Sequence, residues 1–189
     1  MKSIAVYCGS SAGINGIYKE QAQKLGEMLA SRGIEVIFGG GKVGLMGHLA
    51  DAVIHAGGKV TGIIPGFLHI KEVAHDGLTE MITVSDMHKR KAMIYERSDG
   101  FIALPGGFGT LDELFEMLTW AQLGLHLKPV GILNVNGYFN PILDGIENMV
   151  AEGFLKAENR DIIQVSGEAN ELLQIMEQYK APPVPKWIK

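Results

Sequence analysis

The feature that most constrains the fold is a regular alternation of short apolar runs with segments of helical periodicity. Apolar residues recur at helical spacing at Ala22, Leu25 and Met28, for example. Near-continuous apolar strands joined by helices predict a parallel sheet covered on both faces, hence a Rossmann-like, doubly wound α/β fold with right-handed crossovers. The runs predicted as strands are residues 4–8, 34–38, 59–64, 81–84, 100–104, 130–133 and, less distinctly, 162–165.

Length and composition set the number of domains. The chain has 189 residues, of which 47% are hydrophobic, so it can bury one sizeable core but is short for two ordinary domains. We expect one Rossmann-like domain over residues 1–180. Residues 181–189, with the sequence APPVPKWIK, are expected to form a proline-broken tail, because proline cannot continue a helix.

Charge and cysteine content exclude several classes of protein. The formal net charge of −4 gives no basic footprint for a polyanion, so we expect no nucleic-acid partner. Cys8 is the only cysteine, which leaves neither a disulfide framework nor thiolates at metal-binding spacing and fits a reducing, cytoplasmic setting. The sequence has no apolar run of 18 residues and no signal-peptide core at its start, so we expect no membrane partner.

Three predicted strands end in glycine-rich turns, and parallel strands bring such turns to one edge of the sheet, where ligands bind in these folds. The turns lie at residues 8–11, 38–44 and 104–110. Glycine lets backbone N–H groups approach an anion, and a following helix N-terminus adds partial positive charge, so a phosphate cradle that includes Gly9, Ser10, Gly40 and Gly41 is predicted. The alternative is a set of tight turns that need glycine only for its backbone freedom.

A dinucleotide cofactor is disfavoured although Gly39, Gly41 and Gly44 spell G-x-G-x-x-G. Such a site also needs an acidic residue near the end of the next strand to hold the ribose hydroxyls. The run 59–64 instead ends in Pro65-Gly66, and no Walker motif is present. The sequence therefore predicts neither a nucleotide cofactor nor a metal.

A cluster of cations opens the helix predicted after the fourth strand. Ser85 or Asp86 is the expected N-cap, and Lys89, Arg90 and Lys91 fall in the first turns, where the helix dipole disfavours positive charge. A local rule broken in this way is a sign of function. Arg90 is the strongest candidate, because a guanidinium can hold a phosphate or carboxylate with two hydrogen bonds. The alternative is a solvated basic face.

A second cluster, residues 105–113, has both a structural and a functional interpretation. Thr110 and Glu113 have the spacing of a capping box, in which both side chains only cap the helix. The functional interpretation places Glu113 and Glu116 on a different face from the apolar stripe, so that Glu113 can point into the cleft. The stripe consists of Leu111, Leu114, Phe115 and Leu118.

At these residues the chain resembles the Lonely Guy (LOG) family. The family signature P-G-G-x-G-T-x-x-E is matched without departure at residues 105–113, and the motif S-D-M-H-x-R-K is matched at residues 85–91. Further agreement lies at residues 8–11, 39–47 and 119–124, and the resemblance spans about residues 1–180.

The resemblance implies a phosphoribohydrolase that releases free base and ribose 5-phosphate from cytokinin riboside 5′-monophosphates, works without a cofactor and forms a homodimer. It implies Arg90 and Glu113 as catalytic residues. The label "lysine decarboxylase" is disfavoured, because nothing in the sequence resembles a pyridoxal phosphate site. The residues expected to contact the nucleoside monophosphate are Glu72, Met87, Lys91, Gly107, Phe108, Gly109, Thr110, Leu111, Asp112 and Thr119, together with Gly9, Ser10, Gly40 and Gly41.

Glycosidic cleavage passes through an oxocarbenium-like state, so a carboxylate at Glu113 can both stabilise positive charge and activate water. Arg90 would orient the substrate or assist departure of the base. Two alternatives remain at this stage: a non-catalytic module that binds AMP-type nucleotides, and a transferase that acts on the same bond.

Overall fold

The protein folds around one seven-stranded parallel sheet in the order β4-β3-β2-β1-β5-β6-β7. The computed structural model describes residues 1–69 and 74–182. All seven predicted strands are confirmed, with ends that differ by at most one residue from the expected ones. The strands are β1 (Ser3–Tyr7), β2 (Glu35–Phe38), β3 (Val60–Pro65), β4 (Glu80–Val84), β5 (Gly100–Ala103), β6 (Val130–Leu133) and β7 (Ile163–Ser166).

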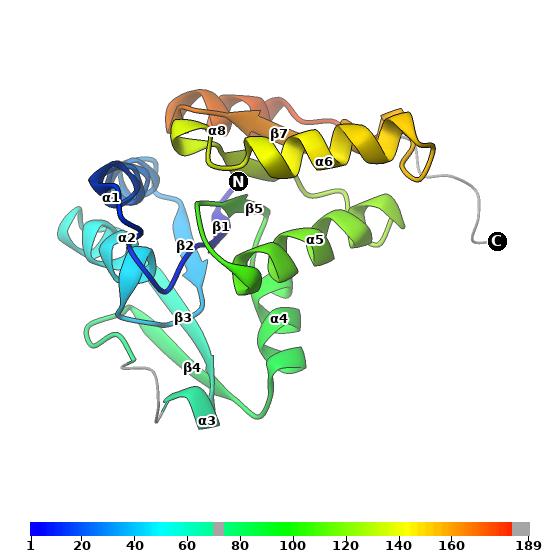
Figure 1. The fold of residues 1–189 in the computed structure, drawn as a ribbon. Helices are drawn as coiled ribbons and strands as arrows, with labels where there is room; N and C mark the ends of the chain where they lie inside the picture. The colour runs from blue at the N-terminus through cyan, green and yellow to red at the C-terminus, as the bar shows by residue number, and fades with distance from the viewer. Residues whose placement is uncertain (70–73, 183–189) are drawn as a thin grey trace.

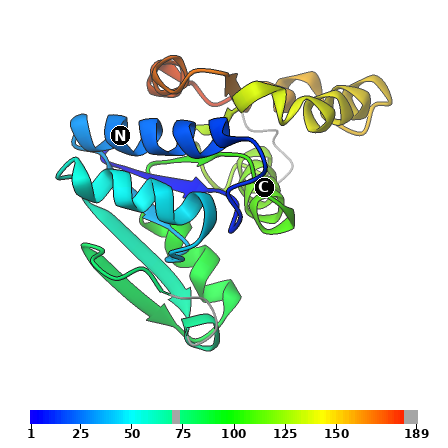
Figure 2. The same ribbon diagram turned by 60° about the vertical axis from the view of Figure 1, so that its left-hand side comes forward.

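Helices cover both faces of the sheet, as Figures 1 and 2 show. Side chains of α1, α2 and α8 form the core on one face, and those of α4, α5 and α6 form the core on the other. The doubly wound architecture is therefore confirmed. The helices are α1 (Gly16–Ser31), α2 (Gly44–His55), α3 (Gly66–His69), α4 (Met87–Glu96), α5 (Phe108–Gln122), α6 (Asn140–Ala151), α7 (Ala157–Arg160) and α8 (Ala169–Gln178), with a 3₁₀ turn η1 (Val135–Gly137). Among the described residues, no helix is long and apolar enough to cross a lipid bilayer.

The period of two along a strand decides which side chains reach the site. In β1, Ile4 and Val6 pack in the core beneath α1 and α2, whereas Ala5 and Tyr7 pack in the core beneath α4 and α5. Tyr7, the last residue of the strand, therefore lies below the face from which α4 and α5 present their polar side chains.

The expected ligand site lies at the carboxyl edge of the sheet, at the point where the order of strands reverses. The loop after β1 leads to α1 on one face, and the loop after β5 leads to α5 on the other face, so the two loops diverge above neighbouring strands. They remain joined by a hydrogen bond of 3.0 Å, donated by the Gly9 amide to the Pro105 carbonyl. A crevice at this position is the usual ligand site of doubly wound sheets.

Parts of two expectations lie outside the described residues. These are Glu72, expected to contact the substrate, and residues 183–189, which make up most of the expected tail. The last helix, α8, ends at Gln178, before the prolines of residues 182, 183 and 185.

Candidate active site

The N-terminus of α4 places Arg90 over the sheet. Asp86 is the N-cap, and its Oδ1 accepts a hydrogen bond of 2.9 Å from the Lys89 amide. Ser85 donates to Asp86 Oδ2 at 2.6 Å, and this bond, first among several, lowers the pKa of that carboxyl. An ionised cap at the helix start offsets the unfavourable placement of the cations that follow.

Three contacts fix the Arg90 guanidinium. Its Nε donates to the Ile63 carbonyl at 3.2 Å, and a terminal nitrogen approaches the Met87 sulfur at 3.8 Å. The other terminal nitrogen lies 3.4 Å from Glu113 Oε1. A guanidinium has five N–H donors, so donors remain for a ligand after these contacts are made.

Gly39 makes room for that arginine. A Cβ atom at residue 39 would overlap the nearer terminal nitrogen of Arg90. The glycine at the end of β2 is therefore required by close packing against the arginine. This is a different role from the phosphate contact expected for its neighbours.

Glu113 is a buried carboxylate without a hydrogen-bond donor on Oε1. The residue is only 9% exposed, and its Oε1 has no hydrogen-bond partner, because the Arg90 contact lacks hydrogen-bond geometry. Burial raises the pKa of Glu113 from 4.5 to about 6, while the charge of Arg90 pulls it down. A carboxyl with a pKa close to neutrality can accept and release protons at physiological pH.

The capping-box interpretation is wrong. The helix α5 begins at Phe108, with Gly107 as its N-cap, so Thr110 lies inside the first turn and Glu113 in the second. The helix therefore starts three residues earlier than the pattern suggested. Thr110 packs tightly under Gly106, where a Cβ atom would overlap its hydroxyl, and this contact fixes the register of the helix against the loop.

The predicted separation of faces on α5 is also wrong. The buried residues of the helix are Thr110, Glu113, Leu114 and Met117, so Glu113 lies on the face that packs against the sheet. Leu111, Phe115 and Leu118 are only partly buried. The carboxyl end of the sheet forms the floor of the cleft. Glu113 therefore lines the cleft from the face of α5 that packs against the sheet.

A cavity of about 240 Å³ contains this pair. Its walls come from the ends of β1 and β2, the start of α4 and the start of α5. Ten of the residues expected at the site line it, namely Gly9, Ser10, Met87, Arg90, Gly107, Phe108, Gly109, Thr110, Asp112 and Glu113. Phe108 is 92% exposed at its rim, which leaves an apolar ring available to a ligand.

The start of α5 offers backbone donors to an anion. Gly107 supplies no side-chain cap, and the first amide of this stretch bonded within the helix is that of Leu111, which donates to the Gly107 carbonyl at 3.1 Å. The first turn of a helix leaves its amides without intrahelical partners, and its dipole favours negative charge there. The residues of this stretch, Gly107 to Thr110, line the cavity.

A second ionic cluster lies beside the pair. Lys91 Nζ is 3.3 Å from Asp112 Oδ2 and 3.1 Å from Glu116 Oε1. Burial lowers the pKa of Lys91, but the bonds to Glu116 and Asp112 outweigh this and raise it above its ordinary value. Lys91 is thus a cation that neutralises two carboxylates and does not line the cavity.

Four other expected residues lie away from the cavity. The Gly40 carbonyl accepts a hydrogen bond of 3.1 Å from the His75 amide, and Gly41 forms a bridge with Ala74, so both glycines hold the segment before β4. Leu111, on α5, is partly buried and packs against the core instead of lining the cavity. Thr119 lines a different groove, between α5 and α6.

Six further residues line the cavity that were not among the expected contacts, namely Val6, Tyr7, Cys8, Gly39, Met46 and Leu68. Tyr7 is 4% exposed, and burial, followed by the charges of Glu113 and Glu116, raises the pKa of its phenol. Its position as the last residue of β1 is a signal that could have been used. Leu68 lies in the short helix α3, directly after β3, and carries no comparable signal.

Solved structures share the fold. The X-ray structure of TM1055, a structural genomics target, has a TM-score of 0.71 and 26% identity, and the match covers 95% of this chain and all of that one. The molybdenum cofactor carrier protein of Chlamydomonas reinhardtii also has a TM-score of 0.71, with coverages of 93% and 96%. At 20% identity, the second likeness concerns the fold alone.

Sequence comparisons identify the family. A family model described as "Possible lysine decarboxylase" matches residues 46–176. The probable cytokinin riboside 5′-monophosphate phosphoribohydrolase LOGL1 of Oryza sativa subsp. japonica is 52% identical over 93% of this chain and 79% of its own length. The phosphoribohydrolase LOG1 of Arabidopsis thaliana is 49% identical, over 94% and 84%. The decarboxylase label is historical, since these curated relatives carry the name of a hydrolase, and the chain belongs to the LOG family of cytokinin riboside 5′-monophosphate phosphoribohydrolases.

Proposed function

We propose that this chain hydrolyses the N-glycosidic bond of adenosine 5′-monophosphates, including N6-modified ones, to free base and ribose 5-phosphate. The observation that carries the proposal is the buried Arg90–Glu113 pair, 3.4 Å apart, in a cavity that opens at the N-terminus of α5. The names of the curated relatives support the same reaction.

Glu113 supplies the chemistry at the anomeric carbon. As the bond from C1′ to the base breaks, its electron pair leaves with the base, and positive charge spreads over C1′ and the ring oxygen. The carboxylate stabilises that charge and takes a proton from the attacking water, whose oxygen bonds to C1′. The departing base takes up a proton from solvent, and Glu113 releases the proton that it took from the water, so one water is consumed for each bond cleaved. The donor-free Oε1 is the atom that this role requires.

Arg90 holds Glu113 in the form that reacts. Its charge opposes the effect of burial on the pKa of Glu113 and so favours the ionised carboxylate. Its contacts with Ile63 and Met87 fix the guanidinium, so the carboxylate it faces is fixed as well. The donors that remain are available to the ribose or the phosphate.

The start of α5 holds the 5′-phosphate. Gly107, Gly109 and Thr110 line the cavity, and the first turn of a helix leaves its amides without intrahelical partners and favours an anion. A nucleoside without phosphate would leave these donors unpaired, so it should react poorly. Gly9 and Ser10, from the loop after β1, close the cradle from the opposite side.

The proposal includes a homodimer in the cytoplasm. The groove between α5 and α6, about 260 Å³, is lined by apolar side chains that include Phe115 and Phe154, and Phe154 is 88% exposed. A self-complementary apolar face suits a two-fold interface. Thr119 lies in this groove, so contact between Thr119 and a substrate would require the site of a second copy.

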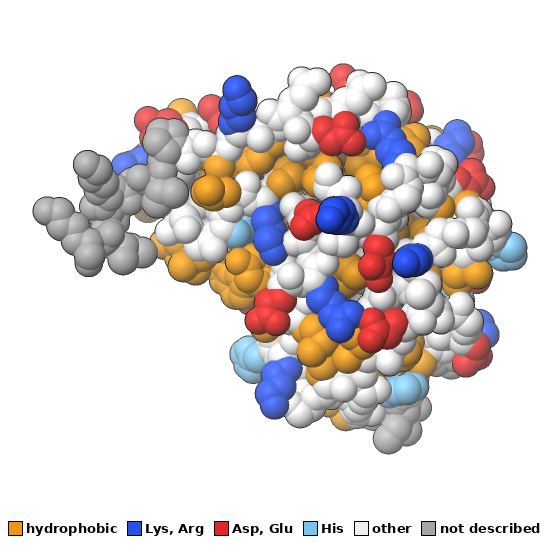
Figure 3. Space-filling model, turned by 180° about the vertical axis from the view of Figure 1, so that it is seen from behind, with side chains coloured by type: hydrophobic (Ala, Val, Ile, Leu, Met, Phe, Trp, Pro, Cys, Tyr) orange, Lys and Arg blue, Asp and Glu red, His pale blue; other side chains and the backbone are white. Residues whose placement is uncertain are grey.

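Acidic and basic side chains are interspersed over the face in Figure 3, where neither sign dominates. The buried free thiol of Cys8 fits a reducing compartment.

The test is incubation of the purified protein with AMP, N6-isopentenyl-AMP and the two corresponding nucleosides, with base and ribose 5-phosphate measured by chromatography. Release from the monophosphates alone is expected. Equal turnover of nucleosides would refute the phosphate cradle. Tight binding without products would favour a nucleotide-binding module, and a requirement for an acceptor other than water would favour a transferase.

A further inference from the structure

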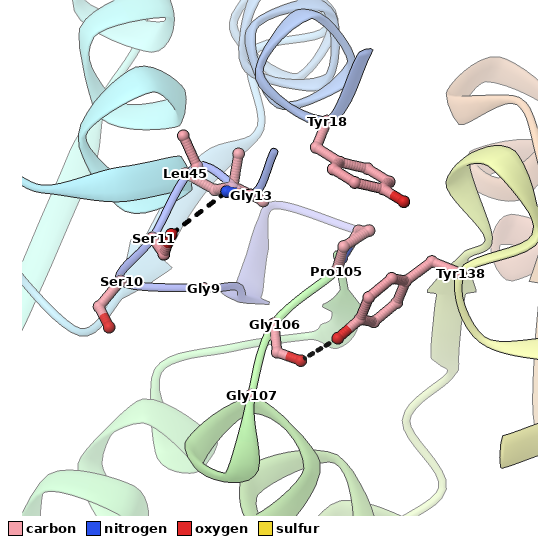
Figure 4. Close-up of a pocket in the computed structure, with 11 residues that line it drawn as sticks. Gly9, Ser10, Ser11, Gly13, Tyr18, Leu45, Pro105, Gly106, Gly107 and Tyr138 are labelled. Atoms are coloured by element: carbon pink, nitrogen blue, oxygen red, sulfur yellow. Dashed lines mark hydrogen bonds between the residues drawn. The ribbon is translucent and has the colours of Figure 1, made fainter. Parts of the chain in front are cut away.

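A second hollow lies on the other side of the joined β1 and β5 loops (Figure 4). Its volume is about 320 Å³. One wall is the loop after β1, from Gly9 to Gly13, and the opposite wall is Pro105 to Gly107, after β5. Tyr18 at the start of α1, Leu45 in α2 and Tyr138 after η1 complete it.

The walls of this hollow are uncharged and partly aromatic. None of the residues that line it carries a charge. The rings of Tyr18 and Tyr138 meet edge to face, with centroids 5.8 Å apart and planes at 76°. The Tyr138 hydroxyl donates a hydrogen bond of 2.6 Å to the Gly106 carbonyl, which fixes that ring against the glycine loop. Figure 4 shows both rings beside this loop.

The hollow adjoins the catalytic cavity. Gly9, Ser10 and Gly107 line both spaces. Gly107 is the N-cap of α5, where the proposed cradle holds the 5′-phosphate. A nucleotide whose ribose faces Glu113 would therefore have its phosphate on the shared wall, with the hollow beyond it.

The chemistry of the walls selects what can extend beyond the phosphate. A second phosphate would find no cationic side chain among the residues that line the hollow, so its added charge would not be paired there. A flat uncharged ring would instead pack against the two tyrosines, as aromatic pairs do. The hollow thus disfavours nucleoside di- and triphosphates and favours an apolar ring.

We propose that this hollow is a subsite for an uncharged planar ring esterified to the 5′-phosphate, so that the chain binds and cleaves adenosine 5′-phosphodiesters of that kind. The inference rests on the proposed function, because it takes the position of the phosphate from it. The glycosidic reaction is unchanged: water adds to C1′, the base leaves, and the phosphodiester stays intact.

The experiment compares the phenyl and methyl esters of AMP, which carry the same charge and differ only in the ring. Affinity is measured by titration calorimetry, adenine release is followed by chromatography, and AMP and ADP are run alongside. The wild-type protein should bind the phenyl ester roughly fivefold more tightly than the methyl ester, as expected for one added aromatic contact. ADP should bind more weakly than AMP.

Two variants test the location of the ring. Tyr18→Ala removes one aromatic wall, and Ala12→Phe fills the hollow. Each should abolish the preference for the phenyl ester while AMP turnover stays at the wild-type rate, which also reports correct folding. Equal affinities of the two esters, or a preference that survives both variants, would overturn the subsite. If the wild-type protein did not cleave AMP but still preferred the phenyl ester, and the variants abolished that preference, the proposed hydrolysis would be refuted and the subsite would stand.

Discussion

Replacing Glu113 with glutamine should stabilise the fold while it removes activity. The pKa of Glu113 is raised from 4.5 to about 6, first by burial, so the folded protein favours the protonated carboxyl. The stability that this group contributes is fully present below the unfolded pKa of 4.5 and is lost as the pH rises through about 6. The wild-type protein therefore bears the cost of an ionised, buried Glu113 at neutral pH, whereas Glu113→Gln does not.

The size of the effect follows from the shift. A rise of about 1.5 pKa units corresponds to about 2 kcal/mol at 1.36 kcal/mol per unit. Glu113→Gln should thus raise the free energy of unfolding by up to about 2 kcal/mol near pH 8, and by much less near pH 4.5. In a chain of this size the melting temperature should rise by roughly 4–8 °C near pH 8. Urea titrations at both pH values, with tryptophan fluorescence as the signal, measure the difference.

The control is Glu152→Gln, at an exposed glutamate that follows α6. It should leave the free energy of unfolding unchanged at both pH values. The reasoning would be refuted if Glu113→Gln were no more stable than the wild type near pH 8. It would also be refuted if the gain were the same at both pH values, because the gain would then not come from ionisation.

Three further outcomes are expected. Gly39→Ala should displace Arg90 and, if Arg90 has the proposed role, lower kcat by roughly 10²-fold or more. Gly145→Ala, where a Cβ meets nothing within 4 Å, should leave kcat unchanged. A normal rate in Gly39→Ala would contradict the packing argument. The acid limb of the pH profile of kcat/KM should lie near pH 6, the pKa of Glu113. Glu116→Gln should move this limb to lower pH, because it removes a negative charge that raises the pKa of Glu113. If the limb did not move, the pH profile would not report the ionisation of Glu113. Phe154→Asp should convert the proposed dimer to monomers in light scattering, and an unchanged mass would exclude this groove as the interface.

Much of the fold was predictable because it depends on local patterns. Apolar runs of four to six residues mark the strands, and β-α alternation restricts the topology to a doubly wound sheet. The glycine turns follow the strands directly, so the position of Gly107 and Gly9 at the carboxyl edge follows once the strands are known.

The start of α5 was mispredicted because two registers satisfy the same sequence pattern. Thr110 and Glu113 could form a capping box, yet the helix begins at Phe108, because Thr110 packs beneath Gly106. That contact joins a loop to a helix in three dimensions, and local capping preferences do not report it.

Contacts between segments that are distant in the sequence also limit how much of the site can be predicted. Gly40 and Gly41 follow a strand as a phosphate loop would, but they pair with His75 and Ala74 instead. Tyr138 reaches the Gly106 carbonyl from 32 residues away, within a segment that carries no motif. Such residues become visible only when the chain is folded.

The central claim is that Glu113, held by Arg90, cleaves the glycosidic bond of a bound 5′-monophosphate. The most direct test measures AMP affinity and single-turnover release of adenine in Glu113→Gln beside the wild type. The account predicts AMP binding close to that of the wild type and a rate lower by roughly 10²–10⁴-fold, the usual contribution of a positioned acid or base. Release of adenine at the wild-type rate would contradict it and would leave Glu113 as a structural residue of α5.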